Sequence, residues 1–171
     1  MGKQLLFCVE ADNKSRTDWV YIKSTIDAFF KVDNSISIKP IFMGGKGNYR
    51  RQKVTGQIKK KINEYKRNGK TFVIYCVDTD DLNKDPNRLR EMKEIREYCE
   101  QKGYEFVWFC RDIEEVFWGT RVDDNEKYQY ADRFRRQNVI EEIEVDMLQS
   151  SEYNVKNSNI ISVLEEYLEK K

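Results

Sequence analysis

The sequence predicts an α/β protein in which a parallel sheet of about four strands is flanked by helices and followed by a helical C-terminal extension. Short apolar runs alternate with segments of helical periodicity in the order βαβαβαβ, which is typical of a parallel sheet with covering helices. The clearest run, TFVIYCV at 71–77, is apolar on both faces, as central parallel strands are. A chain of 171 residues has the length of about one domain. We therefore expect an α/β domain over residues 1–120 and a helical extension over 121–171 packed on it.

The first half of the chain is predicted to contain two strands and two helices. They are a strand at 3–10, a helix at 16–30, a strand at 37–42, a glycine-rich loop at 43–48 and a helix at 51–67. Ser15 is a suitable N-cap for the first helix. Pro40 has no N–H to donate to a neighbouring strand, so its strand is expected at an edge of the sheet.

The second half is predicted to continue the alternation and then to become helical. Its elements are a strand at 71–77, a helix at 85–102, a strand at 105–110, a short helix at 113–118, a polar loop at 120–125, a helix within 127–149 and a last helix from 159. Asp85-Pro86 is a strong helix start, with an acid at the N-cap and proline at the first helical position. Gly103 ends that helix, and Leu89, Met92 and Ile95 are expected on its inner face.

The composition excludes several classes of catalytic site. The chain has no histidine, so Ser-His-Asp and Cys-His nucleophiles and histidine-ligated zinc are excluded. Three of the four cysteines lie inside apolar runs, where a reduced thiol packs as a small hydrophobic group. Any chemistry must therefore use carboxylates, Lys or Arg, hydroxyls, thiols or a hard metal ion.

The chain also lacks the patterns of membrane and secreted proteins. No apolar run approaches the roughly 20 residues that span a bilayer, and the first residues do not resemble a signal peptide. We expect a cytoplasmic protein that does not bind a membrane. Net charge is only +1, but ten of the residues between Lys46 and Lys70 are basic and one, Glu64, is acidic. This segment is suited to a phosphate backbone, and the alternative is a solvated helix face.

Acidic residues follow three of the four predicted strands. They are Glu10 after the first, Asp78, Asp80 and Asp81 after the third, and Asp112, Glu114 and Glu115 after the fourth. The carboxyl ends of parallel strands lie at one edge of a sheet, where ligands bind. In an extended segment Asp78 and Asp80 point to the same side, and a hard cation such as Mg²⁺ would relieve their repulsion. The pattern predicts a metal site formed by Glu10, Asp78 and Asp80; the alternative is that these acids only cap helices.

The segments that contain these acids carry a family resemblance. LLFCVEA and VIYCVDTDD resemble the TOPRIM domain, whose glutamate and D-x-D motif correspond to Glu10, Asp78 and Asp80. FCRDIEEVFWG is similar to the later acidic motif of OLD-type and RloB-like members, which implies Glu114 and Asp112 as further metal ligands. EADNKSRTDWVYI resembles the RloB-like opening, in which Thr17, Asp18 and Tyr21 would correspond.

The resemblance covers roughly residues 4–120 and implies a Rossmann-like TOPRIM fold. It also implies a Mg²⁺-dependent nuclease, with Mn²⁺ as a substitute ion, that hydrolyses phosphodiester bonds in RNA, including tRNA, or in DNA. Small members of this kind act in phage defence, often beside an ATPase partner. From their positions near the acids, Lys46 and Arg111 are candidates for stabilising charge in the transition state, and the loop at 44–48 for a phosphate cradle.

Two other functions are compatible with the same residues. One is a catalytically degenerate TOPRIM-fold subunit that binds or regulates within a nucleic-acid-processing complex. The other is a receiver-like regulator phosphorylated on Asp78. The sequence also leaves open whether the chain assembles with copies of itself.

Overall fold

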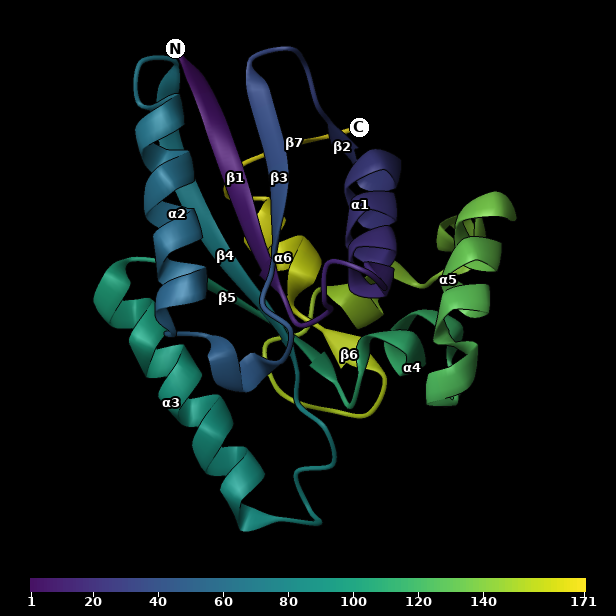
Figure 1. Cartoon of the computed structure of the whole chain (residues 1–171). Helices are drawn as coiled ribbons and strands as arrows, with labels where there is room; N and C mark the ends of the chain where they lie inside the picture. Colours follow the sequence, from purple (N-terminus) through teal and green to yellow (C-terminus); the bar gives the residue numbers. More distant parts are fainter.

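The computed structural model describes residues 1–171 and contains one central five-stranded sheet with the order β3-β1-β4-β5-β6 (Figure 1). Its strands are β1 (Gly2–Val9), β3 (Ile36–Phe42), β4 (Gly69–Asp78), β5 (Glu105–Cys110) and β6 (Asn157–Ser158). The first four strands are mutually parallel and β6 runs antiparallel to β5. The chain therefore has the predicted α/β, Rossmann-like fold class, with one strand more than the sequence indicated.

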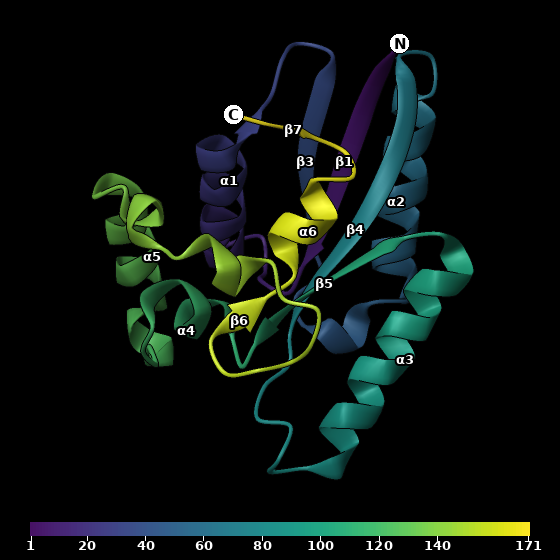
Figure 2. The same ribbon diagram turned by 180° about the vertical axis from the view of Figure 1, so that it is seen from behind.

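Helices cover both faces of the sheet. The helices are α1 (Thr17–Phe29), α2 (Gln52–Tyr65), α3 (Pro86–Lys102), α4 (Ile113–Trp118), α5 (Lys127–Arg136) and α6 (Ile160–Leu164). Figure 1 shows α2 and α3 together on one side, with α1, α4 and α5 on the other, and Figure 2 shows α6 lying across the strands on that second side. Two hydrophobic cores result, because alternate residues of each strand point to opposite faces.

The local signals for most elements operate as predicted. Asp85 caps α3 by accepting the N–H of Asn87, and Gly103 ends that helix in the left-handed conformation. The strand containing Pro40 is β3, an edge strand. The expected cap of α1 is wrong: the N-cap is Arg16, with a φ of 52° and no side-chain cap, and Ser15 is exposed.

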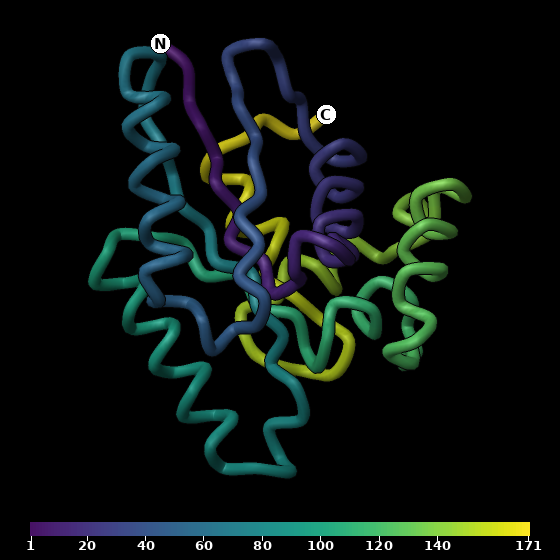
Figure 3. Tube along the Cα trace, in the orientation of Figure 1, coloured from purple at the N-terminus to yellow at the C-terminus, as the bar shows by residue number.

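The helical C-terminal extension is only partly helical. Between α5 and α6 the chain forms two short 3₁₀ helices, Val139–Glu142 and Val145–Leu148, and then the strand β6. Beyond β6, the side chain of Asn159 pairs with backbone groups of β5: it accepts the N–H of Trp108 and donates to the carbonyl of Phe106. The last residues form β7 (Glu169–Lys170), which pairs with β2 (Phe30–Lys31) and brings the C-terminus beside the end of α1 (Figure 3).

Leu89 does not lie on the inner face of α3 as predicted; it is 54% exposed, whereas Met92 and Ile95 are buried. The first turns of α3 extend past the carboxyl edge of the sheet, so Leu89 has no strand to pack on (Figure 1). All four cysteines are buried free thiols, in agreement with the sequence prediction. None of the helices is both long and apolar enough to cross a membrane.

Candidate functional site

Glu10 is positioned by the loop that follows β3. The N–H of Gly45 donates to the Glu10 carbonyl at 2.8 Å, and the N–H of Gly44 donates to the Ala11 carbonyl at 3.4 Å. Gly45 has a φ of 122°, which a residue with a side chain rarely adopts. The N–H groups of Gly44 and Gly45 hold the end of β1, so within the loop predicted as a phosphate cradle these two donors are already engaged.

Asp78 connects three elements at the same edge. Its backbone N–H donates to Glu10 Oε1 at 2.7 Å, and its own Oδ1 accepts the N–H of Ile113 at the start of α4 at 2.9 Å. Burial, followed by the charge of Glu10, raises the pKa of Asp78 well above its usual value. A cation close to this carboxylate would lower the cost of its negative charge.

Asp80 is oriented differently from Asp78. The strand ends at Asp78, and Asp80 has a φ of 56°, so the argument from extended alternation does not apply to it. Lys46 Nζ contacts Asp80 Oδ2 at 2.5 Å and donates to the Asp78 carbonyl at 2.7 Å. Asp80 still acts on the first acid, because its charge raises the pKa of Glu10. The structure thus brings Lys46 into the site as its central cation.

Glu114 is the most deeply buried acid of the site. It is 1% exposed, and neither of its side-chain oxygens has a hydrogen-bond partner. The nearest cation is Lys127 on α5, whose Nζ lies 3.8 Å from Glu114 Oε2. Burial raises the pKa of Glu114 to about 7, although Lys127 opposes the rise. The sequence could not indicate Lys127, because only tertiary packing of the C-terminal segment brings it to this edge.

Asp18 belongs to the same electrostatic network. It stands in the first turn of α1 and accepts the N–H of Ala11 at 3.0 Å. Its charge raises the pKa values of Glu10, Asp78 and Glu114. The sequence contained a signal for Asp18, because Asp18 is the acid of the Thr-acid pair in the segment that resembles the RloB-like opening. Thr17 and Tyr21 of that pattern are buried, and Tyr21 accepts the indole N–H of Trp118.

Burial raises the pKa of Glu10 to about 8, an effect that Lys46 reduces and Asp18 increases. Burial likewise raises the pKa of Glu114 to about 7 and that of Asp78 well above its usual value, so three neighbouring carboxyl groups at this edge have raised pKa values. Perturbed acids that gather at the carboxyl edge of an α/β sheet are typical of a functional site.

A hollow of about 310 Å³ opens beside these acids. We call it the carboxylate hollow; it is lined by Glu10, Ala11, Ser15, Thr17, Asp18, Asp78, Asp124, Lys127 and Tyr128. Ala11 has no left-handed backbone conformation, so this position needs no glycine. The hollow gives solvent and small ions access to Glu10, Asp18 and Asp78.

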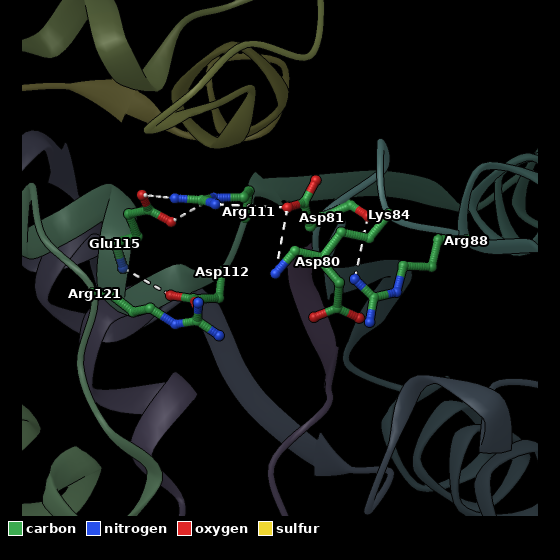
Figure 4. Close-up of a pocket in the computed structure, with 8 residues that line it drawn as sticks. All are labelled: Asp80, Asp81, Lys84, Arg88, Arg111, Asp112, Glu115 and Arg121. Carbon is green, nitrogen blue, oxygen red and sulfur yellow. Dashed lines mark hydrogen bonds and ion pairs between the residues drawn. The ribbon is translucent and has the colours of Figure 1, made fainter. Parts of the chain in front are cut away.

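A second, polar hollow of about 140 Å³ lies on the other side of Asp80 (Figure 4). Its lining is entirely polar and consists of Asp80, Asp81, Lys84, Arg88, Arg111, Asp112, Glu115 and Arg121. Arg111 makes a bidentate pair with Glu115 at 3.0 and 2.7 Å, so the charge of this candidate residue is already compensated. Asp112 caps α4 by accepting the N–H of Glu115 at 2.8 Å.

The residues at the edge fit a hard divalent ion by their chemistry. Glu114 has two unpartnered buried oxygens, and Glu10 and Asp78 are half-buried acids with raised pKa values. No three acidic or cysteine side chains already surround one point as a ready ligand set. Binding of an ion would therefore require side chains, Asp80 and Asp112 among them, to leave their present partners.

Comparison of the chain with protein-family models, with curated proteins and with solved structures finds no match in any of the three.

Proposed function

We propose that this chain is a Mg²⁺-dependent nuclease of the TOPRIM type, similar to the RloB-like and OLD-type enzymes, that hydrolyses phosphodiester bonds in RNA or DNA. One observation carries the proposal: carboxyl groups that follow β1, end β4 and lie in α4 gather at the carboxyl edge of a parallel sheet, and Glu114 among them is buried without a hydrogen-bond partner. Such a group of acids lowers the stability of a fold unless a cation neutralises it.

The residues that would hold the ion are Glu10, Asp78 and Glu114, with Asp80 and Asp112 available once they leave Lys46 and the cap of α4. Mg²⁺ supplies Lewis-acid stabilisation of charge on phosphoryl oxygens and favours ionisation of water. Asp18 increases the negative potential at Glu10 and Asp78, and so favours binding of a cation.

Cations of the chain itself are placed to hold a phosphate beside the acids. Lys46 is fixed between Asp78 and Asp80 and would be released towards substrate when Asp80 binds an ion. Arg88 and Arg121 line the polar hollow and form no ion pair with any carboxylate (Figure 4). Guanidinium groups in this position suit the phosphate next to the one that is cut.

The biological setting is part of the proposal. Action in phage defence beside an ATPase partner follows from the resemblance to RloB-like and OLD-type proteins. The four unpaired cysteines are compatible with a reducing compartment such as the cytoplasm.

A catalytically degenerate TOPRIM-type binding or regulatory subunit is the second candidate. The observation that favours it is the contact of Lys46 with Asp80 at 2.5 Å, together with the absence of a ready ligand set. In a protein that binds nucleic acid without cutting it, the ammonium group of a lysine can neutralise these carboxylates in place of a metal ion.

Calorimetric titration with Mn²⁺ separates the two candidates. We expect saturable binding to the wild type and loss of binding in Asp78→Asn, which keeps the shape of the side chain and its acceptor for Ile113. Glu94→Gln is the matched control, because Glu94 is an exposed acid of α3 outside every ion pair, and it should bind normally.

A cleavage screen with Mg²⁺ over tRNA, single-stranded and duplex nucleic acids then tests the activity. Asp78→Asn and Asp80→Asn should abolish cutting while Glu94→Gln retains it. Activity in either aspartate variant would refute the site. Absence of Mn²⁺ binding and of cutting in a folded wild type would favour the non-catalytic candidate.

A further inference from the structure

Helix α2 presents a strongly basic surface to solvent. We call this surface the basic face of α2; it consists of Lys53, Lys59 and Lys60 on the helix and of Lys66 and Arg67 in the turn that follows it, all of them exposed. The only acid on the helix is Glu64. The opposite side of α2 packs on the sheet through Val54 and Ile58, and the five cations lie on the side that faces solvent.

None of these five cations forms an ion pair, although ion pairs are common elsewhere on the molecule. Lys46, the first cation of the basic segment, is different, since it is 11% exposed and held by Asp80. A surface on which like charges accumulate without compensation resists close approach unless a polyanion neutralises it. The solvated face considered in the sequence analysis would more commonly alternate the two signs.

The charges are arranged in rows along the helix. Lys53 and Lys60 are seven residues apart, which is about two turns or about 10.5 Å along the axis, and Arg67 follows in the turn just beyond the helix. Lys59 and Lys66 repeat the same spacing in a second row. Between the two rows lie Gly56 and Asn63, which are uncharged and have short side chains. The surface between the rows is therefore a shallow channel with cations on both sides.

An anionic membrane is a poor match for this face. A helix that binds a lipid surface carries apolar side chains that enter the interface, with basic residues beside them. The exposed residues of α2 are Gln, Lys, Gly, Asn and the single acid Glu64, and none of them is apolar. The chemistry matches the repeating phosphates of a nucleic-acid backbone, which lysine and arginine neutralise without reading base sequence.

We propose that the basic face of α2 binds the sugar-phosphate backbone of a nucleic acid and directs it to the acidic edge from one side. The amino end of α2 lies near the carboxyl ends of the strands, and the helix runs from there towards the opposite end of the sheet (Figure 1). The proposed binding of nucleic acid to this face does not depend on catalysis. The proposal that the strand reaches the acids from one side only rests on the proposed nuclease function.

The length of the helix predicts the footprint. The 14 residues of α2 extend about 21 Å, which corresponds to about six base pairs of duplex at about 3.4 Å each. Substrate on one side of the cut should therefore contribute affinity over about this length, and substrate on the other side should contribute much less.

Fluorescence anisotropy with labelled RNA and DNA oligonucleotides tests the surface. The triple variant Lys53→Gln/Lys60→Gln/Arg67→Gln should bind at least about tenfold more weakly and should reduce the slope of log affinity against log salt by about 2 to 3. The control Lys23→Gln/Lys93→Gln/Lys170→Gln removes the same charge from exposed, ion-paired positions on other elements. It should bind as the wild type does.

Equal losses in the two triple variants would mean that net charge alone matters and would overturn the proposal. Binding of wild type to anionic vesicles, but not to oligonucleotides, would overturn it as well. Binding that depends on the basic face of α2 without any cutting would support the surface and refute the nuclease together with the one-sided path. Where cutting occurs, trimming the substrate on one side of the mapped position should raise KM, and equal effects on both sides would refute that path.

Discussion

Glu114→Gln offers the sharpest test of the acidic edge because Glu114 is almost fully buried and lacks a hydrogen-bond partner. Burial raises the pKa of Glu114 from 4.5 to about 7 in the folded chain. An acid with a raised pKa takes up a proton on folding, so its contribution to stability is greatest below about pH 4.5 and is lost as the pH rises to about 7. The glutamine variant cannot ionise and avoids this loss.

The magnitude follows from the two pKa values. The difference between about 7 and 4.5, at about 1.4 kcal/mol for each pKa unit, amounts to about 3 kcal/mol. At about pH 5 the variant and wild type should have similar free energies of unfolding, because burying a neutral carboxyl group costs about as much as burying an amide. At about pH 9 Glu114→Gln should be more stable than the wild type by about 3 kcal/mol.

Urea denaturation monitored by tryptophan fluorescence, at both pH values and without divalent ions, measures this difference. Glu94→Gln, at an exposed position, should change stability by less than about 0.5 kcal/mol at either pH. Excess Mn²⁺ at high pH should stabilise the wild type more than Glu114→Gln, because the ion replaces the lost proton. If the wild type and Glu114→Gln lose stability in parallel as the pH rises, Glu114 does not carry the buried charge and the reasoning is refuted.

Two glycines should respond to alanine in opposite directions. A Cβ on Gly69 would lie 1.7 Å from the Gly2 carbonyl oxygen, where β1 and β4 begin to pair, so Gly69→Ala should lose more than about 2 kcal/mol of stability. A wild-type urea midpoint in Gly69→Ala would contradict the register of these strands. A Cβ on Gly56 would meet nothing within 4 Å, and Gly56→Ala should gain about 0.5–1 kcal/mol because glycine is a poor helix former. A lower midpoint in Gly56→Ala would show that α2 is not the regular exposed helix described above.

Much of the fold was predictable because its signals are local. The apolar runs of β1, β4 and β5 and the caps at Asp85 and Gly103 depend on residues close in the chain, and the structure confirms them. The strands β6 and β7 have two residues each and no periodicity, so no local pattern could reveal them. Leu89 also shows what local patterns leave out: it lies at the predicted position of the helix, but the sheet does not extend far enough to cover it.

For the candidate site, the order of residues along the chain already places acids after the strands β1, β4 and β5, and parallel topology gathers them at one edge. The surroundings of each acid at that edge depend on packing between distant segments. Lys46 pairs with Asp80 across 34 positions of the chain, and Lys127 approaches Glu114 from a helix of the C-terminal segment. The pKa of a carboxyl group depends on burial and on such neighbours, which packing brings together from distant parts of the chain.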